Sequence, residues 1–208
     1  MGILGASGHG KVVAEVALAA GWEAVTFFDD AWPQKSTIGK WTVAGDGNVL
    51  FTSLGDLDGV IVAIGRNEIR LALLDRLRSA GAIVVTVVHP AAVISDSAHL
   101  GAGSVVMPGA IINADTSIGD GAILNTGCSV DHDCVLGNAV HVSPGARLAG
   151  GVIVGDRAWI GIGAVVRQGQ RIGQDVVVGA GAAVVSDLPA GVVAVGVPAR
   201  PLSTCSSK

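Results

Sequence analysis

The segment at residues 118–148, IGDGAILNTGCSVDHDCVLGNAVHVSPGARL, has an aliphatic residue at every sixth position. The same step continues in both directions without a slip. It gives sixteen successive aliphatic residues: Ile94, Leu100, Val106, Ile112, Ile118, Leu124, Val130, Leu136, Val142, Leu148, Val154, Ile160, Val166, Ile172, Val178 and Val184. The residue four places after each of them is usually small, for example at Ala110, Ala122, Cys128, Cys134, Ala146 and Ala158.

A strict period of six fits neither the 3.6-residue period of a helix nor the alternation of a single strand. It is typical of a parallel β-helix built from hexapeptides, in which each hexapeptide forms a short strand and a corner, and three complete a triangular coil. The run therefore predicts five coils with no inserted loop. Because Cys128 and Cys134 occupy the small inward positions, we expect them to pack in the core rather than act as nucleophiles or metal ligands.

Composition and charge limit the class of protein. The net charge is −4 and the charges are well spread, which argues against nucleic acid as a partner. The mean hydropathy is +0.60, but apolar runs such as 60–64 and 82–88 are far shorter than the ~20 residues that span a membrane. Met1 leads into an apolar strand with no basic segment before it. We expect no secretory signal, no membrane insertion and a cytoplasmic location.

The first 88 residues do not follow the repeat and predict a separate α/β domain. Apolar segments predict strands at 2–4, 24–28, 59–64 and 83–88, and helices at 12–20 and 67–80. Strands that alternate with helices favour a small parallel sheet of Rossmann-like outline. We therefore divide the chain into a Rossmann-like domain at 1–88 and a β-helix domain at 89–208 that ends in a polar tail.

The glycine-rich turn GASGHGK at 5–11 joins the first strand to the first helix. Val12 stands where a P-loop needs Ser or Thr, and the G-x-x-G-x-G spacing differs from the dinucleotide fingerprint. What remains is a helix N-terminus whose backbone N–H groups suit an anion, with Lys11 nearby. A diphosphate is the natural ligand, and Asp29 and Asp30 follow the second strand where a base or sugar needs acceptors. The alternative is a turn that binds no ligand.

Polar residues at outward positions of the repeat are the candidates for chemistry. His132 lies between Asp131 and Asp133, and an acidic neighbour can fix the tautomer of an imidazole and raise its basicity. One ring nitrogen would then be free to take a proton, as a general base does. The alternative is a solvated histidine in a charged turn. His141, nine residues on, could donate to a ligand or simply cap a corner.

Six segments together resemble the NeuD/PglD family of hexapeptide acyltransferases: GASGHGK at 5–11, FFDD at 27–30, AIGRNEIR at 63–70, NTGCSVDHDC at 125–134, HVSPGARLAG at 141–150 and GVPARP at 196–201. These bacterial enzymes acetylate sugars for surface glycans. The resemblance implies a left-handed β-helix, a homotrimer, acetyl-CoA in the groove between neighbouring solenoids, and no metal. It also implies that the N-terminal domain binds a nucleotide-linked 4-amino-sugar whose amine is acetylated.

The same resemblance implies roles for single residues. His132 would be the general base and Asp133 the carboxylate that assists it, in a direct transfer. The expected coenzyme contacts are His141, Ile162, Ala180, Gly196 and Pro198. The expected nucleotide-sugar contacts are Ser7, Gly8, His9, Asp29, Asp30 and Gly65, with Lys11 from the glycine turn. Arg66 stands where relatives commonly carry Asn, which leaves the details of the sugar pocket open.

Three other functions are compatible with parts of the sequence. A sialic acid O-acetyltransferase of the same family would acetylate a hydroxyl instead of an amine. A γ-type carbonic anhydrase is also a trimeric hexapeptide helix, but it needs three zinc-binding histidines, and His132 and His141 are the exposed candidates in the repeat. A non-catalytic sensor would bind a nucleotide-sugar without releasing CoA.

Overall fold

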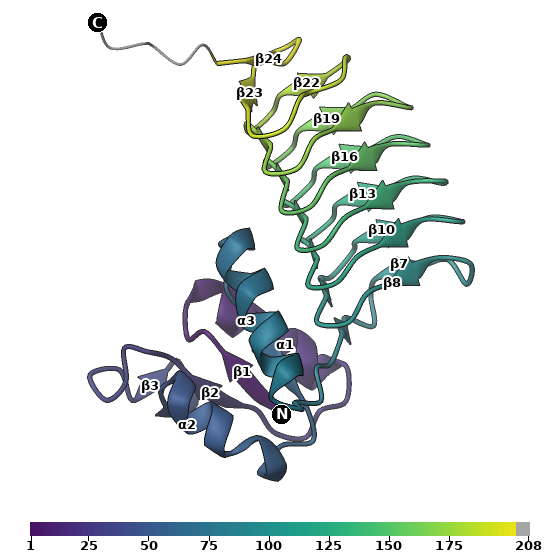
Figure 1. Cartoon of the computed structure of the whole chain (residues 1–208). Coiled ribbons are helices and arrows are strands. Elements are labelled where there is room, and N and C mark those ends of the chain that lie inside the picture. The colour runs from purple at the N-terminus through teal and green to yellow at the C-terminus, as the bar shows by residue number, and fades with distance from the viewer. Residues whose placement is uncertain (203–208) are drawn as a thin grey trace, which may run out of the picture.

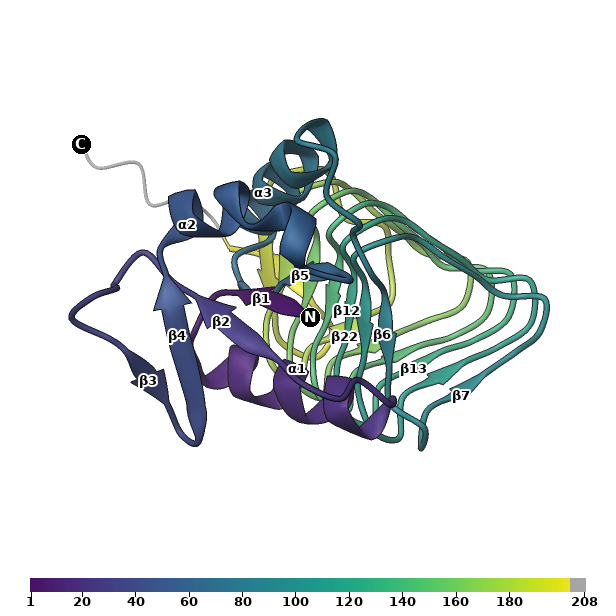
Figure 2. The same ribbon diagram turned by 90° about the horizontal axis from the view of Figure 1, so that it is seen from below.

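The computed structural model describes residues 1–202. It shows an N-terminal α/β unit at one end of a long triangular solenoid (Figure 1). Seen from below, the coils stack as a triangle and the N-terminal unit lies against one of its sides (Figure 2). No helix within this range is long and apolar enough to cross a membrane.

The N-terminal unit is built on a five-stranded sheet of order β3-β4-β2-β1-β5. Its strands are β1 (Gly2–Leu4), β2 (Thr26–Phe28), β3 (Thr37–Ile38), β4 (Trp41–Gly45) and β5 (Val60–Val62). Its helices are α1 (Gly8–Ala19), α2 (Gly47–Thr52), the 3₁₀ turn η1 (Leu54–Asp56) and α3 (Asn67–Ser79). The strands β1, β2, β4 and β5 are parallel, as the Rossmann-like outline predicted.

Two apolar clusters hold this sheet. Residues of α1 such as Val13 pack with Ile3 on one side, together with solenoid residues such as Ile123. On the other side Leu4 packs with Leu50 of α2 and Leu77 of α3. The sheet therefore lies between α1 with the solenoid and the pair α2 and α3.

The solenoid has three faces, each a parallel sheet, and only the last strand of face 1 is antiparallel among the described residues. Face 1 contains β6 (Val87–Val88), β9 (Val105–Val106), β12 (Ile123–Leu124), β15 (His141–Val142), β18 (Trp159–Ile160), β21 (Val177–Val178), β23 (Val193–Val195) and the antiparallel β24 (Arg200–Pro201). Face 2 contains β7 (Val93–Ile94), β10 (Ile111–Ile112), β13 (Ser129–Val130), β16 (Arg147–Leu148), β19 (Val165–Val166) and β22 (Ala183–Val184). Face 3 contains β8 (His99–Leu100), β11 (Ser117–Ile118), β14 (Val135–Leu136), β17 (Ile153–Val154) and β20 (Arg171–Ile172).

The inward positions are those that the six-residue period predicted. Each aliphatic of the repeat ends a strand, and strands pair with an 18-residue offset, as Val130 does with Leu148. These side chains form one continuous core, with Ile94 and Leu100 partly buried at its end. Cys128 and Cys134 are buried in that core, which confirms the packing expected for them.

The corners follow a rule that the aliphatic pattern does not reveal. From residue 103 to residue 181, the third residue after each aliphatic has a positive φ. Glycine occupies most of these positions, but Asp133 adopts φ 58°. We name the corners by the faces they join: 131–133 is a corner 2–3, 161–163 a corner 1–2, and 119–121 a corner 3–1.

Three expectations for the N-terminal unit need correction. The strand predicted at 83–88 is divided: Val84 forms a parallel bridge with Val60 of β5, as predicted, but Val87–Val88 pairs with β9 of the solenoid. Val88 lies one six-residue step before Ile94, so the repeat begins earlier than Ile94. The first helix begins at Gly8 instead of Val12, and the polar stretch after the second strand forms β3, β4 and α2. The domain boundary at residue 88 stays a prediction, and the tail at 203–208 lies outside the described residues.

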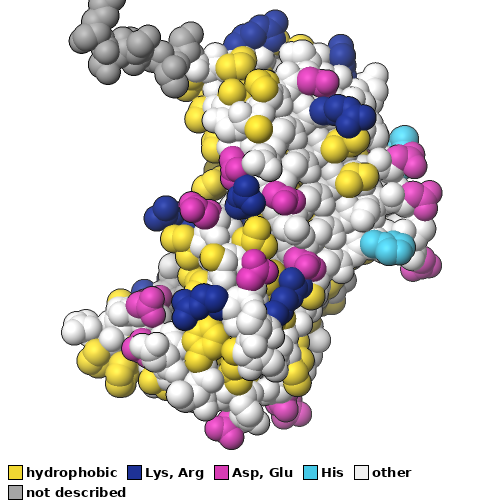
Figure 3. All heavy atoms as spheres, in the orientation of Figure 1, with side chains coloured by type: hydrophobic (Ala, Val, Ile, Leu, Met, Phe, Trp, Pro, Cys, Tyr) yellow, Lys and Arg dark blue, Asp and Glu magenta, His cyan; other side chains and the backbone are white. Residues whose placement is uncertain are grey.

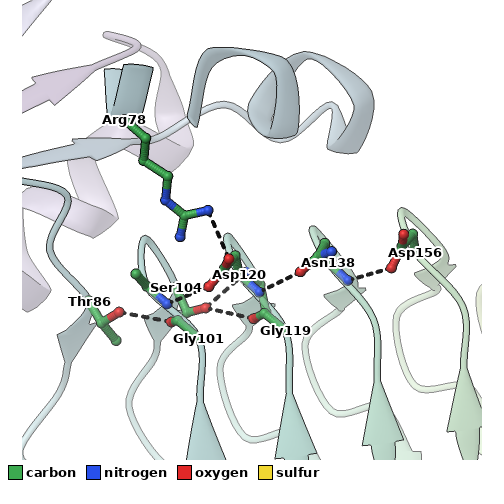
Figure 4. A network of polar contacts seen from close by, with 10 residues as sticks. Arg78, Thr86, Gly101, Ser104, Gly119, Asp120, Asn138 and Asp156 are labelled. Atoms are coloured by element: carbon green, nitrogen blue, oxygen red, sulfur yellow. Dashed lines mark hydrogen bonds and ion pairs between the residues drawn. The ribbon is translucent and has the colours of Figure 1, made fainter. Parts of the chain in front are cut away.

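The helix α3 is fixed to a corner 3–1 of the solenoid. Arg78 donates to Asp120 at 2.8 Å, and Asp120 belongs to a ladder in which Asn138 and Asp156 follow at 18-residue intervals (Figure 4). Asn138 Oδ1 accepts from the N–H of Asp120, and Asp156 Oδ1 accepts from the N–H of Asn138. These side chains satisfy backbone donors at the corner and place the N-terminal unit against it.

Candidate active site

A cavity of about 710 Å³ lies on the N-terminal unit at its junction with the solenoid. Figure 3 shows the molecule hollowed where this unit meets the upper coils. The cavity is lined by Leu4, Gly5, Ser7, Asp29, Asp30, Asp46, Gly47, Asn48, Phe51, Ile64, Gly65, Arg66, Leu73, Arg76 and Trp159. Trp159 comes from β18 of face 1, so the solenoid contributes to a cavity that is otherwise N-terminal. Its volume lies in the range of about 300–1,000 Å³ typical of small-molecule sites.

The glycine turn lies at the edge of this cavity. Ser7 is the N-cap of α1 and makes no side-chain capping hydrogen bond, which leaves the first N–H groups of the helix open to a ligand. Ser7 and Gly65 line the cavity, and their predicted contact with a nucleotide-sugar stays a prediction. Gly8, His9 and Lys11 are not among its lining residues, so their predicted contacts are not seen in this cavity.

The two predicted acidic contacts do different things. Asp29 accepts from the N–H of Ala6 at 2.7 Å with Oδ2 and from the N–H of Ala31 at 3.0 Å with Oδ1. Both of its oxygens therefore hold loops around the cavity. Asp30 accepts from the N–H of Gly47 at 3.1 Å with Oδ1, which leaves Oδ2 as an acceptor for a ligand.

Many residues that line the cavity were not predicted from the sequence, and four of them are charged or aromatic. They are Asp46 with Phe51, which belong to the N-cap and body of α2, and Arg76 with Trp159. The start of α2 has a signal in the sequence, because Asp is a preferred N-cap residue. Asp46 acts as the N-cap and accepts from the N–H of Val49 at 2.9 Å. Arg76 lies over the ring of Phe51 at 5.0 Å, so a cation and an aromatic ring form one side of the cavity.

Two histidines predicted as ligand contacts are withdrawn from solvent, His9 partly and His141 almost fully. His9 Nε2 and His141 Nδ1 are buried and have no hydrogen-bond partner within residues 1–202. Burial, together with the smaller effect of the Arg70 charge, lowers the pKa of His9 to about 4 and that of His141 to about 3. Both imidazoles are therefore neutral at pH 7.

His141 is held in place by its neighbours on face 1. Its ring stacks on Trp159 with centroids 4.9 Å apart, and Nε2 lies 3.2 Å from Nδ2 of Asn125. Trp159 Nε1 in turn donates to Ser143 Oγ at 2.7 Å. Because His141 is only 7 % exposed, its predicted contact with a thioester would be confined to the one unpartnered nitrogen.

His132 lies in a corner 2–3, on a different edge of the solenoid from the cavity. Its Nδ1 lies 2.7 Å from Asp133 Oδ2, and its side chain is 60 % exposed. The hydrogen bond with Asp133 raises the pKa of His132, and the charge of Asp131 adds to this effect. Nε2 has no partner in the described part of the chain, so it is the atom that can take a proton. The predicted contact with a carboxylate is present, and its role stays a prediction.

The ring of His132 lies against Gly150, one coil further on. A Cβ atom on Gly150 would lie 2.5 Å from Cε1 and 2.6 Å from Nε2 of His132. The backbone N–H groups on either side of Gly150 donate at 3.0 and 2.9 Å, but that of Gly150 has no acceptor among the described residues. Gly150 was not singled out from the sequence, although the 18-residue coil places it directly after His132.

Four of the five predicted coenzyme contacts lie along corner 1–2, whereas His141 lies on face 1. Ile162 is 62 % exposed, and Ala180 follows it one coil later, with the N–H of Gly181 donating to the carbonyl of Ile162 at 2.8 Å. Gly196 and Pro198 continue the same edge, because the N–H of Ala183 donates to Gly196 at 3.0 Å. The candidate residues of one chain therefore lie at three separate places: the cavity, corner 1–2, and corner 2–3 with His132.

The chain is similar to several known proteins. The family model for the PglD N-terminal domain matches residues 1–77. The acetyltransferase domain of PglB from Neisseria gonorrhoeae, in complex with acetyl coenzyme A, is 41% identical over 97% of this chain and 98% of that chain, with a TM-score of 0.92. PerB from Caulobacter crescentus, in complex with CoA and GDP-perosamine, is 46% identical over 97% of this chain and 96% of that chain, with a TM-score of 0.92. WeeI from Acinetobacter baumannii is 32% identical over 97% of this chain and 98% of that chain, with a TM-score of 0.87.

The chain belongs to the NeuD/PglD family. Membership confirms the resemblance in the sequence, the Rossmann-like N-terminal region and the left-handed β-helix. It also confirms the class of the protein as an acyltransferase. For this NeuD/PglD member, the sugar, the number of subunits and the roles of single residues stay predictions.

Proposed function

We propose that the protein is an acetyl-CoA-dependent N-acetyltransferase that acetylates the 4-amino group of a nucleotide-linked deoxy-sugar. The observation that supports this most is the imidazole of His132, which has one nitrogen on Asp133 and the other free beside the unpaired N–H of Gly150. A base and an N–H donor a few ångströms apart are what the attack of an amine on a thioester requires. Acetyl-CoA is the natural donor, since PglB was solved with it.

His132 accepts the proton that the amine loses as it attacks. Asp133 holds Nδ1 in its protonated form, so Nε2 presents its lone pair to the solvent side of the corner. The raised pKa makes His132 a better proton acceptor. General base catalysis of this kind contributes about 10²–10⁴-fold.

The N–H of Gly150 stabilises the negative charge that develops on the thioester carbonyl oxygen. Preorganised backbone donors of this kind are worth about 10²–10³-fold each. Glycine is required here because a side chain would occupy the position of the imidazole. The pair of His132 and Gly150 therefore supplies both the base and the anion donor from successive coils.

The transfer is direct, without an acyl-enzyme. Cys128 and Cys134 are buried in the solenoid core, and burial raises the pKa of both thiols, that of Cys128 to about 12. A buried neutral thiol is a poor nucleophile at pH 7. No cysteine within residues 1–202 is thus placed to carry the acetyl group.

The nucleotide-sugar occupies the cavity of the N-terminal unit, with its diphosphate at the N-terminus of α1. The cavity and His132 lie on different edges of one chain, so the sugar amine of one subunit meets His132 of another. A homotrimer in which corner 2–3 of one solenoid faces corner 1–2 of the next satisfies this need. Acetyl-CoA lies between them, along Ile162, Ala180, Gly196 and Pro198. We place the reaction in the cytoplasm, in the synthesis of a bacterial surface glycan or glycoprotein.

The test is a thiol-release assay with acetyl-CoA and a panel of UDP-, GDP- and dTDP-linked 4-amino-sugars. We expect CoA release with at least one of them and a product whose mass has grown by one acetyl group. Loss of the primary amine in that product supports N-acetylation. Loss of a hydroxyl with the amine intact would replace the proposal by O-acetylation, and binding without CoA release would replace it by a sensor.

A further inference from the structure

The most completely bonded side chain in the described structure is Arg70 of α3. It is 1 % exposed, and all five N–H donors of its guanidinium are used. Its bonds run from Nε to Gly121 O (2.7 Å), from Nη1 to Ile64 O (2.9 Å) and Gly65 O (3.2 Å), and from Nη2 to Asn67 Oδ1 (2.8 Å) and Ala139 O (2.8 Å).

These acceptors are neutral, and within residues 1–202 no carboxylate pairs with the Arg70 charge. Burying a charge without a counter-ion costs several kcal/mol, and an apolar side chain of similar volume would pack at no such cost. Burial lowers the pKa of Arg70 to about 9, so the group still carries its charge at pH 7. The arrangement therefore indicates a role beyond packing.

The five acceptors belong to two parts of the molecule that lie far apart in the sequence. Ile64 and Gly65 line the cavity between β5 and α3. Gly121 and Ala139 lie in successive corners 3–1 of the solenoid, 51 and 69 residues from Arg70. The guanidinium thus ties one edge of the cavity to the solenoid that supplies Trp159 to the same cavity.

We propose that Arg70 is a positioning residue for the nucleotide-sugar, which sets the Ile64–Gly65 edge of the cavity against the solenoid so that the sugar reaches the reaction site in one orientation. This inference rests on the proposed function. Burial is the main cause that lowers the pKa values of His9 and His141, and the Arg70 charge adds to it. A displaced cavity edge weakens sugar binding but leaves corner 1–2, the expected coenzyme site, unchanged.

The same helix supplies a matched control. Arg78 also joins α3 to a corner 3–1, through Asp120, but it is partly exposed and does not line the cavity. Arg78→Met therefore removes a contact between the N-terminal unit and the solenoid without touching the cavity edge. Arg70→Met removes the five bonds, and Arg70→Lys keeps the charge with at most three donors.

The experiment compares KM for the nucleotide-sugar and KM for acetyl-CoA in the three variants, at a temperature below their melting transitions. For Arg70→Met we expect the sugar KM to rise about tenfold or more, and the acetyl-CoA KM to stay within about twofold. Arg70→Lys should lie between wild type and Arg70→Met, and Arg78→Met should match wild type in both constants. If Arg70→Met does not fold, the inference is tested by the sugar KM of Arg70→Lys compared with that of wild type.

An unchanged sugar KM in folded Arg70→Lys and Arg70→Met would overturn the inference. An equal rise in both KM values would also overturn it, because a general loosening of the fold acts on both substrates. If wild type turns over none of the panel of nucleotide-linked amino-sugars, the proposed function fails and this inference fails with it. If wild type turns over the substrate and the Arg70 variants keep the wild-type sugar KM, the proposed function stands and only the positioning role of Arg70 is rejected.

Discussion

The imidazole of His132 lies against Gly150, so close that a single added methyl group would lie 2.5 Å from its Cε1. The two residues are 18 positions apart, which is one turn of the solenoid. Residue 150 therefore has to lack a side chain for residue 132 to keep its position. The same glycine carries the backbone N–H that has no acceptor in the described structure.

Gly150→Ala tests this contact. The new Cβ displaces the exposed ring of His132 from its place beside the N–H, so we expect kcat to fall by about 10²-fold or more while the melting temperature changes little. The measurement is steady-state kinetics together with thermal unfolding. Gly55→Ala is the control, because a Cβ there meets nothing within 4 Å and Gly55 lies away from both corners. Wild-type kcat in Gly150→Ala would remove the contact from the mechanism.

Asp133→Asn tests whether the Asp133 carboxylate raises the basicity of His132. The neutral form of His132 is the active base, so kcat/KM rises with pH through the pKa of His132, which the hydrogen bond with Asp133 raises above 6.5. Removal of the Asp133 charge shifts the midpoint of the profile to lower pH and lowers the plateau. A pH–rate profile of kcat/KM from pH 5 to pH 9 measures both. A midpoint that does not move would show that Asp133 does not tune His132.

The buried histidines predict a loss of stability in acid. The folded chain keeps His9 and His141 neutral down to about pH 4 and about pH 3, whereas the unfolded chain protonates them near pH 6.5. Between these values the unfolded state binds more protons, so stability falls as the pH falls, by about 2 kcal/mol per imidazole at pH 5. Chemical unfolding at pH 7 and pH 5 measures this difference.

Replacement of either histidine separates this effect from other titrations. In His141→Asn the fall in stability between pH 7 and pH 5 should shrink by about 2 kcal/mol. His99→Gln is the control, because it replaces an exposed histidine on face 3. A pH dependence equal to that of wild type in His141→Asn would mean that this imidazole is protonated in the folded chain.

A site shared between subunits predicts complementation. His132→Ala removes the base, and Gly65→Leu fills the cavity at a position where a Cβ meets nothing within 4 Å. Each variant alone should be inactive. In mixed trimers formed by co-expression, an intact cavity meets an intact His132 at about a quarter of the sites, so about a quarter of wild-type activity should return. Mixed trimers as inactive as the single variants would place both elements in one subunit.

The repeat made much of the fold predictable. Its six-residue period is a stronger signal than the secondary-structure propensity of any single residue, and each position of the period has the same environment, buried or exposed, in every coil. His132 and Asp133 were predictable as a pair since they are adjacent in the sequence. The places of Trp159 and Arg76 in the cavity were not predictable from the sequence. Only folding brings Trp159 of the solenoid and Arg76 of α3 to the same cavity as the glycine turn. Asp29 lines the cavity and also accepts from two backbone N–H groups, a structural use that the sequence does not reveal.

The central claim is that His132 takes the proton from the sugar amine. It is tested most directly by the turnover of His132→Ala with acetyl-CoA and the nucleotide-linked amino-sugar on which wild type acts. We predict a fall in kcat of about 10²–10⁴-fold with the assembly and the acetyl-CoA affinity unchanged. Turnover of His132→Ala at the wild-type rate would contradict the claim.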